Sequence, residues 1–229
     1  MFRIHPVAKL FLVSLIVAII SACARLPEYA RPRMVEPGEA QMGAPAFFRY
    51  RALTAEDFRA TSPSGQLSGH AEKINAHAAI QIRLAPESSF RITPGVLYGQ
   101  VHFFGRVERL GFEAVMLPDR SWWNPDLPSS QHAYVLQHEQ IHFALTEIAA
   151  RHLTRESRDW APELLAIKRT QQEVREELSR QIKERIDAAL ETSLKRQLQF
   201  DEETSLFHNP RRQEWWLRMV TEELKEVSY

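Results

Sequence analysis

The chain has a single cysteine, Cys23, which excludes an intramolecular disulfide and a zinc site made of four thiolates. Any metal site must therefore use histidine, aspartate or glutamate. An excess of basic charge is also lacking, because 29 Lys and Arg residues are matched by 29 Asp and Glu residues. No dense basic stripe is interleaved with aromatic residues, so the sequence does not indicate a nucleic-acid partner.

Glycine is missing from the second half of the chain. All eight glycines lie at or before Gly111, and only Pro162 and Pro210 follow Pro128. Because Gly and Pro mark turns, this distribution predicts strands and loops first and long helices afterwards. The expected fold class is α+β, with a small antiparallel sheet in the N-terminal half packed on a helix, followed by a long helix and a C-terminal helix.

The N-terminal apolar run is too short to cross a membrane. It extends from Leu10 to Ile20, is interrupted by Ser14, and falls well short of the ~20 residues that a spanning helix needs. A basic start precedes it and small residues follow it, which is typical of a secretory signal peptide, here residues 1–22. The segment is either the signal of a lipoprotein, or a plain signal peptide or uncleaved anchor that ends near a cysteine by chance.

The segment "ISAC", residues 20–23, resembles the lipobox of bacterial lipoproteins. The resemblance implies that Cys23 is lipidated and becomes the N-terminus of a lipid-anchored protein of the cell envelope. The residue after the cysteine is Ala24 and not an aspartate, which resembles an outer-membrane rather than an inner-membrane lipoprotein signal. We therefore expect the protein at the periplasmic face of the outer membrane. Residues 23–46, rich in proline, predict a tether, and residues 47–229 the folded domain.

Alternating apolar residues predict a half-buried strand over Ile74–Leu84. The stretches "LYGQVHFFGRVERL" (97–110) and "GFEAVMLP" (111–118) follow, and their β-branched and aromatic residues indicate a hairpin or meander with a turn between them. Part of Val101–Leu117 is a candidate for the edge strand that pairs with an extended substrate.

Three helices are expected in the second half. The first begins at Pro128–Ser130, where a serine can cap the first turn, and ends near Leu153. The second begins after Pro162, because residues 163–209 contain neither Gly nor Pro, and the last follows Pro210. The second helix carries an apolar stripe that drifts slowly round it: Val174, Leu178, Ile182, Ile186, Leu190, Leu194 and Leu198.

The first of these helices contains "LQHEQIHFALTE", residues 136–147, with an H-E-x-x-H motif. On a helix, His138 and His142 lie on one face and can hold the same zinc ion. Glu139 can then act as the general base for a zinc-activated water that attacks a carbonyl. The alternative is an exposed helix face with two solvated histidines.

A catalytic zinc site usually has a third protein ligand. Glu147 lies about 180° round the helix from His138, and His152 lies about 15 Å beyond His142, so neither suits direct ligation. The stretch "FDEETSLFHNP" at the end of the long helix offers further candidates, between which spacing does not choose: Asp201, Glu202, Glu203 and His208.

Four segments between Phe48 and Met219 resemble the domain-of-unknown-function family of predicted bacterial secreted zinc-dependent proteases. They are "YRALTAEDFRATSP", "LPDRSWW", "LQHEQIHFALTEIAARHL" and "LQFDEETSLFHNPRRQEWW". The chain departs from the family where glycine, an acidic residue and glycine are common, at Ile141, Ala144 and Asn209 respectively.

The resemblance implies a role for each matching residue of the motifs. His138 and His142 would be zinc ligands, Glu139 the catalytic base and His208 the third ligand. Asp201 would orient a liganding imidazole through its other nitrogen.

The expected function is therefore an envelope lipoprotein that acts as a zinc metallopeptidase on a protein or peptide substrate. A cell-wall amide is a substrate that the same chemistry would serve. The alternative is a non-catalytic lipoprotein, with or without zinc, that binds a protein partner through its long helix. The sequence does not indicate an oligomeric state.

Overall fold

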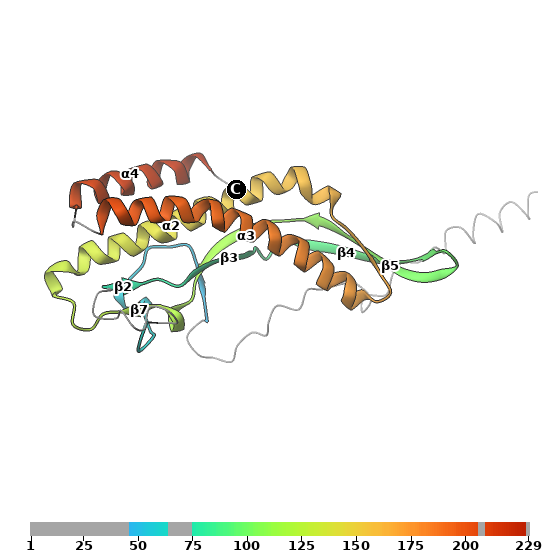
Figure 1. Ribbon diagram of the computed structural model, residues 1–229, viewed down its shortest axis with the longest axis horizontal. Helices are drawn as coiled ribbons and strands as arrows, with labels where there is room; N and C mark the ends of the chain where they lie inside the picture. Colours follow the sequence, from blue (N-terminus) through green and yellow to red (C-terminus); the bar gives the residue numbers. More distant parts are fainter. Residues whose placement is uncertain (1–45, 64–74, 206–208, 228–229) are drawn as a thin grey trace, which may run out of the picture. The chain divides into compact units, whose positions relative to one another are not determined.

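The computed structural model describes residues 46–63, 75–205 and 209–227, all within one compact unit, Met34–Tyr229. The described elements are short strands, then helix α2, strand β8 and helices α3 and α4, so the fold class is α+β as expected (Figure 1). None of the helices in these ranges is long and apolar enough to cross a membrane. The predicted signal peptide, Cys23 and nearly all of the predicted tether lie outside the described residues.

The sheet nearest the predicted site has three antiparallel strands in the order β1-β6-β3. These are β1 (Phe48–Arg49), β6 (Phe112–Met116) and β3 (Ile80–Leu84). The central strand β6 is buried along its whole length because α2 packs across it. Strand β3 is paired on one side only among the described strands, which makes it an edge of this sheet.

The strand expected over Ile74–Leu84 is present but interrupted. Its first part, β2 (Ala76–His77), pairs with β7 (Trp122–Trp123) in a separate two-stranded sheet. The ladder breaks at Ala78 and Ala79 because their backbone N–H groups donate to the side chains of Glu139 and Ser121 instead, at 2.8 Å and 2.9 Å.

A third sheet has the order β4-β5-β8, with β4 at Ser89–Leu97, β5 at Gln100–Arg109 and β8 at Leu165–Lys168. The two residues that join β4 to β5, Tyr98 and Gly99, have φ angles of 51° and 73°. Positive φ at both positions is the geometry of a tight two-residue hairpin, which sets the register of the two strands.

The predicted pairing of residues 97–110 with residues 111–118 is therefore wrong. Strand β5 takes its partners from β4 and β8, and β6 takes its partners from β1 and β3. The tight turn at Tyr98–Gly99 closes β5 onto the preceding strand, so the break near Gly111 only carries the chain from one sheet to the other.

Helix α2 (Ser129–Trp160) extends beyond the predicted end at Leu153, because the next strong stop signal is Pro162. Its N-cap is Pro128, with no side-chain cap, so the predicted serine cap is wrong. The helix packs against the β1-β6-β3 sheet on one side and against α3 and α4 on the other. Its long apolar side chains are almost fully buried: Val135, Ile141, Phe143, Leu145, Ile148 and Leu153.

Helix α3 (Gln171–Thr204) begins later than predicted. The residues just after Pro162 form β8 instead, because β5 offers them a free edge to pair with. Thr170 and Glu173 then form a reciprocal capping box at the start of the helix. The helix rests directly on β5 at Gly105, where an added Cβ would lie 2.2 Å from a methyl group of Val174.

The apolar stripe of α3 drifts round the helix, so that it is buried at its start and exposed near its end. Val174, Leu178 and Ile182 are at most 2% exposed, whereas Leu194 and Leu198 are both 52% exposed. Helix α4 (Pro210–Glu226) starts at the predicted proline, with Asn209 as its cap. A buried cluster that includes Phe200, Trp216 and Val220 ties the end of α3 to α2 and α4.

Candidate metal centre

The two histidines of the H-E-x-x-H motif lie side by side on α2. Their ring centroids are 4.7 Å apart, and the Nε2 atoms of His138 and His142 approach to 3.0 Å. Their side chains are 13% and 19% exposed. Both rings therefore direct the same nitrogen to one point that remains accessible from a cleft.

The last turn of α3 places a carboxylate at that point. Oδ1 of Asp201 lies 3.1 Å from Nε2 of His138 and 2.9 Å from Nε2 of His142. These three residues form a group that could hold a metal ion, with ligand atoms all within 4.8 Å of one another. Tetrahedral zinc ligands at ~2.1 Å from the ion lie roughly 3.4 Å apart, so small outward movements would fit the ion.

The charges of the three residues are mutually dependent. Burial raises the pKa of Asp201, but hydrogen bonds from His138 and His142 outweigh it and hold that pKa well below its usual range. Burial lowers the pKa of His142, yet the hydrogen bond to Asp201 and the charge of Glu139 shift the net pKa upward. The carboxylate of Asp201 and the imidazole of His142 therefore stabilise each other's charged forms.

Gln197 holds the ring of His142 from behind. Nδ1 of His142 donates to Oε1 of Gln197, while the amide nitrogen of Gln197 donates to the His142 carbonyl at 3.3 Å and to Oγ1 of Thr146 at 3.2 Å. With a proton held on Nδ1, Nε2 is the nitrogen that a metal ion would take, in place of its hydrogen bond to Asp201. Gln197 lies one helical turn before Asp201, so α3 supplies both a candidate ligand and a residue that positions His142.

His138 is held by an aromatic ring and a hydroxyl group. Its ring stacks on Phe200 with centroids 4.4 Å apart and planes 27° from parallel. Its Nδ1 lies 3.4 Å from Oγ1 of Thr204, which in turn donates to the Phe200 carbonyl at 2.6 Å. Phe200 and Thr204 are fully buried. The position of His138 therefore depends on the packing of the last turns of α3.

Glu139 lies between the helix and the neighbouring strand. It is 6% exposed, and its Oε2 accepts the N–H of Ala78 at 2.8 Å. No Lys or Arg within the described ranges forms an ion pair with it. The carboxylate is thus fixed next to the histidine pair and lines the same cleft.

The cleft has a volume of about 1130 Å³. One wall is the strand segment Asn75–Gln81, and α3 lines the opposite wall with residues such as Leu190, Leu194 and Gln197. The edge strand beside the site is thus β2–β3. The candidate range Val101–Leu117 is wrong for this role, because β5 and β6 are central strands.

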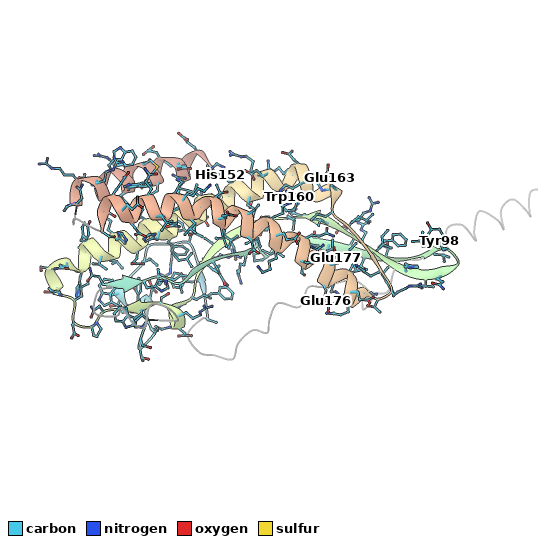
Figure 2. The ribbon with its side chains drawn as sticks, viewed as in Figure 1. Tyr98, His152, Trp160, Glu163, Glu176 and Glu177 are labelled. Atoms are coloured by element: carbon cyan, nitrogen blue, oxygen red, sulfur yellow. The ribbon has the colours of Figure 1, made fainter. Side chains whose placement is uncertain are left out.

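The other candidate ligands lie apart from the site or outside the described residues. Glu147 accepts the N–H of Ala114 at 3.1 Å on another side of α2. His152 lies further along α2, with Nε2 3.6 Å from a carboxylate oxygen of Glu223 on α4 (Figure 2). His208 and Cys23 fall outside the described ranges, so the ligand and lipidation predictions for them stay predictions.

Asp201 was one of the candidate third ligands of the sequence, while the family resemblance favoured His208 and gave Asp201 the role of orienting a liganding imidazole; Gln197 was not predicted. The structure places Oδ1 of Asp201 at Nε2 of both histidines, rather than at an outer nitrogen. The four-residue spacing of Gln197 and Asp201 on a predicted helix was a usable signal, since it puts both on one face.

No family model, curated protein or solved structure matches the chain.

Proposed function

We propose that the chain is a zinc-dependent metallopeptidase with a zincin-like active site. The proposal is carried by one observation. Glu139 is buried, forms no ion pair with a Lys or Arg of the described residues, and lies beside the His138–His142–Asp201 group in a large cleft. Two imidazoles and a carboxylate suit zinc and leave room for a water or a substrate oxygen. When bound, zinc would lower the pKa of water and polarise the carbonyl under attack.

Glu139 performs the proton transfer in this proposal. Its carboxylate takes a proton from the attacking water and later delivers it to the leaving amine. The hydrogen bond from Ala78 keeps the carboxylate oriented. No Arg or Lys of the described residues forms an ion pair with it, so its charge would be balanced by the bound metal ion. These are the properties required of a general base.

The strand β2–β3 suits an extended peptide substrate. Residues 75–81 line the cleft, and pairing with β7 and β6 occupies only one edge of these strands among the described elements. A peptide that adds to such an edge gains backbone hydrogen bonds, while alternate side chains enter pockets. Leu190 and Leu194 on the opposite wall would favour an apolar side chain near the scissile bond.

The proposal includes a lipid anchor at Cys23 on the periplasmic face of the bacterial outer membrane. Its support is the signal-peptide layout and the "ISAC" segment, which place the only cysteine at the end of the apolar run. Mass spectrometry of the purified chain would test it, because a lipidated N-terminal cysteine adds the mass of acyl chains and removes residues 1–22.

The enzymatic proposal is tested by metal analysis and peptide hydrolysis on the full chain. We expect about one zinc per chain, lost in His138→Ala and Asp201→Ala and retained in His152→Ala, which lies on the same helix away from the site. His208→Ala decides whether that residue is a further ligand. Iron is measured in parallel because the same ligand set suits ferrous iron.

Glu139→Gln separates catalysis from metal binding. We expect the variant to keep its zinc and to lose peptide hydrolysis, measured with a mixture of unstructured peptides and with cell-wall fragments. An unaltered chain that binds zinc but hydrolyses neither the peptides nor the cell-wall fragments would contradict the peptidase proposal. The alternative, a partner-binding lipoprotein, would then lead, with exposed Leu194 and Leu198 of α3 as its first candidate contacts.

A further inference from the structure

The β4–β5 hairpin extends beyond the elements that support it. Strand β8 last pairs with β5 at Lys168 and Phe103, whereas β4 and β5 stay paired to Leu97 and Gln100. Three further residue steps correspond to roughly 10 Å of unsupported hairpin. Figure 1 shows this hairpin running past the start of α3, and Figure 2 shows Tyr98 at its end.

The hairpin tip is apolar and exposed. Val96, Tyr98 and Val101 are 72%, 94% and 59% exposed, the highest values among the large exposed hydrophobic side chains of the described residues. Residues 92–105 contain no Asp, Glu, Lys or Arg. An uncharged run of this kind is unusual for a surface hairpin, whose strands normally carry charges on the solvent side.

Apolar side chains lie on both faces of the hairpin. On the face that packs on α3, buried Ile92 is followed along β4 by exposed Pro94 and Val96, which no described element covers. The opposite face carries Leu97 and Phe104, with Leu165 and Ile167 of the adjacent β8, and its polar side chains near the tip, Gln100 and His102, are uncharged amide and imidazole groups. A docked protein would cover one face, whereas lipid can surround both.

Basic residues lie where the uncharged run ends. Arg91 and Arg106 are directly opposite each other on β4 and β5, and Lys168 lies at the end of β8. Arg91 pairs with Glu108 and Lys168 with Glu177, while Arg106 forms no ion pair within the described part of the chain. This level of the hairpin therefore offers Arg106 to a lipid phosphate.

We propose that the tip of this hairpin, residues 96–101, inserts into the interface of a lipid membrane. The outer edges of β4 and β5 carry unpaired backbone groups at the tip, which would be costly in hydrocarbon. Insertion is therefore shallow, at the boundary between headgroups and acyl chains, where polypeptides bury ~5–10 Å. That depth corresponds to the unsupported length of the hairpin, and an exposed tyrosine at its end suits this layer.

The test measures the depth of individual positions in the full chain reconstituted into vesicles of phosphatidylcholine and phosphatidylglycerol. A nitroxide is attached to a cysteine at Val96, Tyr98 or Val101 in turn. Glu163→Cys, at an exposed position on the body of the domain, is the matched control (Figure 2). The unaltered chain, labelled in parallel, reports any label taken up by Cys23.

We expect labels at the three tip positions to collide more often with dissolved oxygen than with a water-soluble nickel chelate, and the label at position 163 to show the reverse. Water-like values at the tip would overturn the proposal. Spin–spin broadening at position 98, in vesicles and in detergent alike, would overturn it in favour of a second copy of the chain. Neither readout depends on metal binding or turnover, so the peptidase proposal stands or fails separately.

Discussion

Helix α2 carries two buried glutamates, Glu139 and Glu147. Both accept a hydrogen bond from a backbone N–H, but their other surroundings differ. Each accepts a backbone N–H from the neighbouring strand region, from Ala78 between β2 and β3 at 2.8 Å and from Ala114 in β6 at 3.1 Å. Glu147 also receives a hydrogen bond from Arg151 at 2.8 Å, whereas Glu139 forms no ion pair with a Lys or Arg of the described residues and lines the cleft.

The difference shows what turns a buried carboxylate into a structural or a chemical group. Arg151 neutralises Glu147 and donates to the carbonyls of Leu224 and Val227, so this pair joins the sheet, α2 and the end of α4. Glu139 lies beside the histidine pair instead, where, under the proposed function, a bound metal ion would balance its charge. A carboxylate paired with an arginine is held in that ion pair, whereas one balanced by a bound metal ion would remain available for proton transfer.

The sharpest test of this comparison is the turnover of two matched variants. Glu139→Gln is expected to lower kcat for peptide hydrolysis by about 10²–10⁴-fold, the usual contribution of a general base. Glu147→Gln removes a charge of the same kind eight residues further along and should leave kcat within a few-fold. Comparable losses in both variants would show that Glu139 acts only through the fold.

The stability of the same helix should respond in the opposite order. Glu147→Leu leaves Arg151 without its carboxylate and the Ala114 N–H without an acceptor, so we expect a loss of about 3 kcal/mol in the free energy of unfolding. Glu139→Gln retains an oxygen for Ala78 and should cost less than about 1 kcal/mol. Urea unfolding of the metal-free proteins measures both values, and a larger loss in Glu139→Gln would reverse the assignment.

Gln197→Leu tests whether the site is positioned from α3. The variant removes the acceptor of the His142 Nδ1 proton, so zinc affinity should fall by about 10–100-fold. Gln199→Leu, on an exposed face of the same helix, is the control and should bind zinc normally. Competition with a chromogenic chelator measures affinity directly, and unchanged binding in Gln197→Leu would exclude the positioning role.

A third carboxylate, Glu203, extends the comparison to the surface. The hydrogen bond from Arg212 lowers its pKa to about 2, against the opposing effect of burial, and Gln199 and Trp216 add further hydrogen bonds that lower it. A depressed folded-state pKa stabilises the fold above the ordinary value of about 4.5, and that stability is lost as the pH falls toward 2.

Glu203→Gln should therefore make unfolding less dependent on pH between about 4.5 and 2. Its loss of stability should reach its full value above about 4.5 and be modest there, because solvent-accessible ion pairs contribute little. Thermal unfolding across this pH range measures the difference between the variant and the unaltered chain. Parallel curves would show that Glu203 has the same pKa in the folded and unfolded chain.

Local patterns predicted the elements whose formation depends on neighbouring residues. The absence of Gly and Pro predicted the long helices, and the four-residue spacing of His138 and His142 placed both rings on one face. The predictions were wrong where the pairing of a strand depends on residues distant in the chain. The absence of Gly and Pro predicted a helix at residues 165–168, but these residues pair with an edge of β5 and form β8.

The sequence by itself determined the α+β class, the histidine pair and the adjacent glutamate, because helix periodicity is set by residues within a turn or two of each other. Only the tertiary structure decided that Asp201 and Gln197 join that pair across some sixty residues of chain, and that β2–β3 is the edge strand. Such contacts depend on how the buried faces of α2, α3 and the sheets pack together. No short-range pattern records that packing, since the free energy that selects it comes from apolar surfaces distant in sequence.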